Sequence, residues 1–138
     1  MDMLETNRHV IDRFRAGGEI EGMQRDRLLL LTTTGARTGR ERTSPMMFHR
    51  EGERVVVIAS NMGAADDPSW CVNLRADPQV SVEIGDERYA ATAHVLAGED
   101  RAAVWGRIQA AYPFFVEHEE SAGAREIPVV ELVRVSEG

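Results

Sequence analysis

Hydrophobic residues near the start of the chain recur with the period of a helix. Within residues 6–16, apolar side chains lie on one side of a helical wheel, namely Val10, Ile11 and Phe14. Two glycines follow, and this pattern predicts an amphipathic helix that ends just before them. We therefore assign residues 1–18 to an N-terminal helical segment that packs on the rest of the domain.

Three short runs of apolar or β-branched residues come next, and each predicts a strand. They cover residues 27–34, 43–50 and 54–60, with four consecutive leucines in the first run. Glycine-containing turns at residues 35–39 and 51–53 join these runs. Strands joined by such short turns predict an antiparallel meander.

The second half of the chain alternates between helical and strand patterns. Asp67 is expected to cap a short helix over residues 69–75, with Pro68 at the first helical position. The remaining predicted elements are strands over 80–84 and 88–96, a helix over 100–112 and a strand over 128–135. This order favours an α+β fold, a small antiparallel barrel of about six strands with short flanking helices.

Composition and charge narrow the possible functions. The chain has 138 residues without a repeat or a linker, so we expect one domain over residues 1–138. A formal net charge of −7 argues against a nucleic-acid-binding surface. No apolar run reaches membrane-spanning length and the N-terminus has no signal-peptide pattern, so we expect a cytoplasmic protein. One cysteine and four scattered histidines offer no metal-ligand spacing, and we expect no metal.

A basic segment interrupts this acidic chain. Residues 35–42 lie on the turn between the first two predicted strands and carry one acid and three arginines, Arg37, Arg40 and Arg42. One guanidinium group can bind two oxygens of a phosphate or a carboxylate at once. Glycines let a ligand approach the backbone closely. The segment is therefore either an anion site or a solvated hairpin turn.

A second candidate region joins the third predicted strand to the short helix after it. Small and polar residues occupy positions 59–64, and Trp70 stands in the first turn of the helix. Backbone N–H groups at such a loop and helix start suit an anionic or carbonyl-rich ligand. Trp70 fits either a place in the core or a flat wall beside a ring system.

Together these two regions resemble the signature of a known family. The stretch TTTGARTG (residues 32–39), followed by RTSP (42–45) and by PSWCVNL (68–74), resembles the deazaflavin-dependent nitroreductase family. The similarity covers nearly the whole chain in order, from the N-terminal helix to IPVV at residues 127–130. Members of this family are small split β-barrels that use coenzyme F420, so the resemblance implies that fold and that coenzyme.

The resemblance also implies which residues form the site. In the family, a basic turn holds the coenzyme's phosphate, a strand runs under the coenzyme, and a loop and a helix start close around the deazaflavin ring. The matching cofactor-binding residues here are Arg37, Thr38, Arg42, Thr43, Ser44, Pro45, Met46, Met47, Ile58, Ala59, Ser60, Asn61, Ser69, Trp70, Cys71, Val72, Asn73 and Phe115. Ser60 and Tyr112 are the candidate catalytic residues, because a hydroxyl can stabilise the charge that develops on the substrate.

The implied reaction is hydride transfer from reduced deazaflavin to a flat electrophile such as a quinone, an enone or a nitroaromatic ring. Met47, Cys71 and Phe115 stand where nitroreductase members carry substrate-framing tyrosines, so we expect weak reduction of bulky nitro compounds. Two alternatives stay open, an FMN-binding split-barrel oxidoreductase and a non-catalytic deazaflavin carrier. The expected partner is a small electron-accepting molecule, not nucleic acid, and the expected assembly is a monomer or a homodimer.

Overall fold

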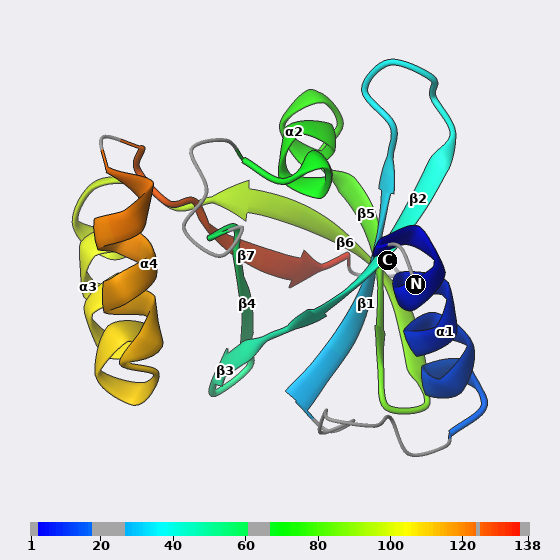
Figure 1. The fold of residues 1–138 in the computed structure, drawn as a ribbon, viewed down its shortest axis with the longest axis horizontal. Helices are drawn as coiled ribbons and strands as arrows, with labels where there is room; N and C mark the ends of the chain where they lie inside the picture. The colour runs from blue at the N-terminus through cyan, green and yellow to red at the C-terminus, as the bar shows by residue number, and fades with distance from the viewer. Residues whose placement is uncertain (1–2, 18–26, 61–66, 124, 136–138) are drawn as a thin grey trace.

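Seven antiparallel strands form one curled sheet at the centre of the computed structural model (Figure 1). The structure describes residues 3–17, 27–60, 67–123 and 125–135. The strands pair in the order β2-β1-β5-β6-β7-β4-β3. Their bounds are β1 Leu28–Thr34, β2 Glu41–Met47, β3 His49–Glu51, β4 Arg54–Ile58, β5 Gln79–Ile84, β6 Glu87–Val95 and β7 Val129–Arg134. The α+β barrel architecture is confirmed, with seven strands where about six were predicted.

The edges of the sheet differ from the predicted meander. The strand predicted over residues 43–50 is divided at Phe48, whose N–H donates to the carbonyl of Arg27 at 3.2 Å. Its two parts, β2 and β3, lie at opposite ends of the strand order, so the chain crosses from one sheet edge to the other. β4 pairs with β3 and β7, not with β2. The predicted meander is wrong because a sheet that curls toward closure brings distant strands together.

β1 is buried on both faces, which explains its run of leucines. Leu29 and Leu31 belong to the main core inside the curl. Leu28 and Leu30 face the other way and pack with Phe14 of helix α1 (Met3–Arg15). A strand covered on both faces is typically apolar at every position. The amphipathic N-terminal helix is confirmed, although it begins and ends earlier than predicted.

Three further helices flank the sheet (Figure 1). Helix α2 (Ser69–Ala76) packs against β1, whereas α3 (Gly98–Ala111) and α4 (Phe114–Ala122) form a pair on the side away from α1. Trp105, Ile108 and Phe115 of this pair pack with strand residues Val56 and Val129 in a separate core cluster. The sequence does not predict α4, because few of its side chains are buried and its apolar period is sparse. Among the described residues, no helix is long and apolar enough to cross a bilayer.

The start of α2 corrects one predicted contact. Pro68 occupies the N-cap position, and no described side chain caps the helix. The carboxylate of Asp67 instead accepts a hydrogen bond from Nη1 of Arg125 at 2.6 Å. A charge-assisted bond to a guanidinium is stronger than a bond to a backbone N–H, so the distant arginine takes the carboxylate.

Candidate functional site

The basic turn between β1 and β2 is a tight, glycine-dependent loop. The N–H of Gly35 donates to the carbonyl of Arg40 at 2.7 Å, and the N–H of Gly39 donates to the carbonyl of Gly35 at 2.9 Å. Gly39 has a φ of +69°, and a Cβ on Gly35 would lie 2.8 Å from Oγ1 of Thr38. Side chains larger than hydrogen are therefore strained at both positions.

This turn presents three arginines to solvent. Arg37, Arg40 and Arg42 are exposed, and none of them forms an ion pair with another residue in the described ranges. Other arginines of the protein are paired, such as Arg15 with Glu83 and Arg107 with Glu51. Uncompensated guanidinium groups close together in the sequence make this turn a candidate anion site.

Asn73 of helix α2 anchors the turn from behind. Its Oδ1 accepts a hydrogen bond from the N–H of Ala36 at 3.0 Å, and its Nδ2 donates to Oγ1 of Thr33 at 3.2 Å. The residue is 8% exposed. The predicted site residue Asn73 therefore fixes the shape of the turn, and nothing in its position requires contact with a ligand.

Replacing Asn73 with leucine should destabilise the protein by about 1–3 kcal/mol, because the buried Thr33 hydroxyl and the partly buried Ala36 N–H lose their partner. Chemical denaturation measures this change. Val72→Ala, on the exposed side of the same helix, is the matched control and should cost less than about 0.5 kcal/mol. Equal losses in the two variants would show that Asn73 does not clamp the turn.

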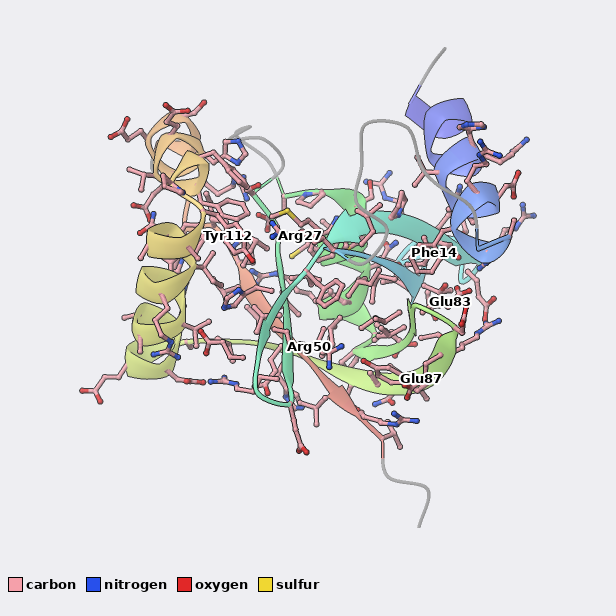
Figure 2. All side chains as sticks on the ribbon, turned by 90° about the horizontal axis from the view of Figure 1, so that it is seen from below. Phe14, Arg27, Arg50, Glu83, Glu87 and Tyr112 are labelled. Carbon is pink, nitrogen blue, oxygen red and sulfur yellow. The ribbon has the colours of Figure 1, made fainter. Side chains whose placement is uncertain are left out.

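A hollow of about 230 Å³ lies between the strands and the α3–α4 pair. Figure 2 shows Tyr112 between this helix pair and the strands. The lining of this hollow, the pocket, is mostly apolar and aromatic, with four residues that carry polar groups. The lining residues are Met46, Met47, Phe48, His49, Ile58, Ser60, Tyr112, Phe114, Phe115 and His118. A hollow of this size and lining suits a flat ring system.

Ser60 is held in the wall of this pocket by two side chains. Nδ1 of His118 lies 3.2 Å from the Ser60 hydroxyl. Arg125 donates to the carbonyl of Ser60 at 2.5 Å and to the carbonyl of Ala59 at 3.0 Å. The same guanidinium binds Asp67. Backbone and hydroxyl of Ser60 are thus both fixed.

A second polar chain leads from the pocket to the surface. The hydroxyl of Tyr112 lies 3.4 Å from Nδ1 of His49, and Nε2 of His49 lies 3.2 Å from the carboxylate of Glu51. Arg107 of α3 binds both oxygens of Glu51, at 2.8 and 2.9 Å. The hydrogen bond from Arg107 lowers the pKa of Glu51 from 4.5 to about 2. Glu51 is therefore a carboxylate at neutral pH.

The Glu51–Arg107 contact gives stability a pH dependence. Because the pKa of Glu51 is lower in the folded state, this contribution is present above about pH 4.5 and is lost as the pH falls toward 2. Glu51→Gln should flatten the thermal stability profile over that window, measured by thermal unfolding at a series of pH values. Glu53→Gln, exposed in the same hairpin, should keep the wild-type slope. A wild-type slope in Glu51→Gln would contradict the assignment.

The predicted site residues fall into three groups. Arg37 and Thr38 lie in the turn, and β2 carries Arg42, Thr43, Ser44 and Pro45 toward the pocket. The predicted residues that line the pocket are Met46, Met47, Ile58, Ser60, Tyr112 and Phe115. Ala59 is buried beside them, and Asn61 lies outside the described residues.

The α2 residues are less closely connected to the pocket. Trp70 packs against the main core, Ser69 is exposed, and Val72 is 49% exposed. Cys71 is fully buried, and burial raises the pKa of its thiol. Within the described residues, α2 therefore supports the turn more than it lines the pocket.

The structure adds five residues that the sequence does not single out. Phe48, His49, Phe114 and His118 line the pocket, and Arg125 holds Ser60. A weak signal exists for His49, because His49 and Glu51 share one face of a strand by alternation. His118 is three residues after Phe115, but this spacing matters only once α4 is known to be helical.

Known proteins resemble this chain over most of its length. The family described as F420H(2)-dependent quinone reductase matches residues 5–134. An F420H(2)-dependent quinone reductase of Mycobacterium tuberculosis is 34% identical over 108 residues, which cover 77% of this chain and 72% of that protein. The solved structure of an F420-H2 dependent reductase (FDR-A) is 36% identical with a TM-score of 0.69, and the match covers 83% of this chain and 99% of that one. A second solved structure, a domain-swapped dimer, is 34% identical with a TM-score of 0.71, and the match covers 91% of this chain and 95% of that one.

These matches confirm the predicted oxidoreductase class, the split-barrel fold and F420 as the coenzyme of the family. They favour F420 over the FMN alternative, because the family is defined by its use of the reduced deazaflavin. The chain belongs to the F420H(2)-dependent quinone reductase family.

Proposed function

We propose that this protein transfers a hydride from reduced coenzyme F420 to a quinone, with the coenzyme's phosphate at the basic turn and its ring in the pocket. One observation carries the proposal: β2 joins the two regions, with Arg42 near its start and Met47 at its end. At the rise of a strand these residues are roughly 17 Å apart. This separation suits a ligand with an anionic group at one end and a flat ring at the other.

The chemical character of each region fits the corresponding part of the coenzyme. Arg37, Thr38 and Arg42 supply exposed cationic and hydroxyl donors for a phosphate, and Arg40 adds a third positive charge for the glutamate tail. Met47, Ile58 and Phe115 supply apolar surface for a ring. When bound, the reduced deazaflavin supplies the hydride.

Ser60 is proposed to stabilise the charge that develops on the substrate. When Nδ1 of His118 donates to the Ser60 oxygen, the hydroxyl hydrogen of Ser60 is free to point at a substrate oxygen. Arg125 fixes the backbone of Ser60, so this donor is positioned before the substrate arrives. A pre-positioned donor stabilises negative charge without reorganisation during the reaction.

The proposal extends the sequence-based expectations on substrate and assembly. Met47 and Phe115 place apolar surface in the pocket, which supports quinone reduction and weak activity on bulky nitro compounds. We propose one domain over residues 1–138, in the cytoplasm, as a monomer or a homodimer. A similar solved structure is a domain-swapped dimer, which supports the second state.

Anaerobic turnover tests the function. The protein should oxidise reduced F420 in the presence of a soluble quinone, forming one hydroquinone for each coenzyme oxidised. FMN should bind far more weakly than F420 in a fluorescence titration, and NADPH should not replace reduced F420. Tight F420 binding without quinone turnover would favour a carrier, and tight FMN binding without F420 binding would overturn the coenzyme assignment.

A further inference from the structure

The pocket contains a hydrogen-bonded chain of three side chains that ends in a carboxylate. Tyr112 and His49 both line the pocket, and Glu51 lies behind His49. The side chain of His49 is 15% exposed and that of Glu51 is 22% exposed. Arg107 holds Glu51 through both carboxylate oxygens. A phenol, an imidazole and an oriented carboxylate therefore connect the interior of the pocket with the protein surface.

We propose that Tyr112, His49 and Glu51 form a proton relay that delivers the last proton to the reduced substrate. The inference rests on the proposed function, because it assumes a substrate that gains a hydride in this pocket. Tyr112 is the group that touches the substrate, and His49 restores the proton of Tyr112. Glu51 is a positioning residue that holds the imidazole in the required orientation.

The proton balance of the reaction requires such a donor. Addition of one hydride to a quinone yields a hydroquinone monoanion, which needs one proton to become the neutral hydroquinone. The Tyr112 hydroxyl gives its proton to the anionic oxygen while Nδ1–H of protonated His49 gives its proton to the Tyr112 oxygen. His49 is left neutral with its Nε2–H still bonded to Glu51, and Nδ1 recovers a proton from water that reaches the pocket after the product leaves. This step transfers protons only, and no group is oxidised or reduced.

The carboxylate of Glu51 decides which nitrogen of His49 faces Tyr112. It accepts the Nε2–H, so in neutral His49 the other nitrogen, Nδ1, is free to accept from the phenol. Glu51 does not exchange the proton itself, because the bond from Arg107 keeps its pKa near 2. This division of roles follows the general pattern of a base oriented by a third group.

His118 is the other histidine of the pocket, and its surroundings differ. It contacts the rings of Phe114 and Phe115, with centroids 5.5 and 5.6 Å away, and the hydroxyl of Ser60. No carboxylate pairs with it among the residues that the structure describes. His118 therefore orients Ser60, whereas His49 has the carboxylate and the phenol that a relay needs.

The charged and titratable groups around His49 come from three elements. Glu51 belongs to the same strand, and Arg50 between them lies on the opposite face of that strand by alternation. Helix α3 contributes Arg107 and, at its end, Tyr112, and α4 contributes His118 across the pocket. β4 places the neutral Val56 opposite His49. The pH dependence of a His49 variant is therefore compared with the pH dependence of a His118 variant.

Nitrogen NMR of the coenzyme-free protein with isotope-labelled histidine tests the relay without turnover. Neutral His49 should be the Nε2–H tautomer. Tyr112→Phe should shift the Nδ1 signal, and Glu51→Gln should raise the share of the other tautomer. Unchanged His49 signals in both variants would overturn the relay, even if the protein reduces quinones.

Turnover provides the second test, on wild type and on His49→Gln. The variant should still bind F420, lose on the order of a hundredfold in kcat, and lose one inflection from the pH profile of kcat. His118→Gln should keep that inflection, and His94→Gln, exposed on β6, should match wild type. Unaltered kcat and pH profile in His49→Gln would overturn the relay. Absence of quinone reduction by the wild type would instead overturn the proposed function, and the NMR result would still report on the hydrogen-bonded chain.

Discussion

Replacing Arg42 with alanine is expected to weaken F420 binding by roughly ten- to a hundredfold. One charge-assisted contact to a phosphate contributes about 1.5–3 kcal/mol. Arg42 is exposed and pairs with no described acid, so its guanidinium is available to the ligand. The thermal stability should change little, because an exposed side chain has little packing to lose. Fluorescence titration of the coenzyme measures the affinity.

Salt and a matched variant separate a specific contact from general charge. The difference between wild type and Arg42→Ala should shrink as salt is added, because ions screen an exposed contact. Arg88→Ala is the control, since Arg88 is exposed in the β5–β6 hairpin, at the opposite end of the molecule from the turn (Figure 1). Arg54 is unsuitable because it pairs with Asp100 and Glu131. Wild-type affinity in Arg42→Ala, or an equal loss in Arg88→Ala, would show that the turn is only a solvated hairpin.

Replacing Arg125 with methionine should cost about 1.5–3 kcal/mol of stability, because the charge-assisted hydrogen bonds of this partly buried guanidinium are lost. The Arg125 side chain is 11% exposed and binds two backbone carbonyls and the carboxylate of Asp67. All three acceptors would lose this donor. For a chain of this size, the unfolding temperature should fall by roughly 5–10 °C.

Arg75→Met is the matched control for this substitution. Arg75 approaches the same carboxylate at 4.0 Å, but its side chain is 51% exposed. An exposed pair contributes at most about 1 kcal/mol, so this variant should remain near wild type. Arg125→Met should also lower kcat, because Ser60 loses its fixed backbone. Similar stability in both variants would contradict the role assigned to Arg125.

The parts of the fold that depend on local sequence are predictable, and the long-range pairings are not. The run of leucines in β1 predicts a buried strand, and its burial on both faces confirms it. The division of one predicted strand at Phe48 depends on closure of the sheet, which no local pattern encodes. Asp67 shows the same limit, because its local cap signal is overridden by Arg125, far away in the sequence.

The candidate site also has one part that the sequence predicts and one part that only the structure shows. The basic turn is contiguous in sequence, so its arginines and glycines are visible without a structure. The pocket is assembled from β2, β3, β4 and the α3–α4 pair. His49 and His118 are therefore single residues without a motif until the fold brings them beside Tyr112 and Ser60. Family resemblance supplies several pocket residues, but the polar partners behind them come from the structure.

The most direct test compares whole F420 with a deazaflavin that lacks the phosphate and the glutamate tail. If the turn and the pocket are two ends of one coenzyme site, Arg42→Ala should weaken binding of whole F420 while leaving the affinity for the tail-less deazaflavin unchanged. Measured by the same fluorescence titration, an equal loss for both ligands, or no loss for whole F420, would contradict the assignment of the phosphate to the turn.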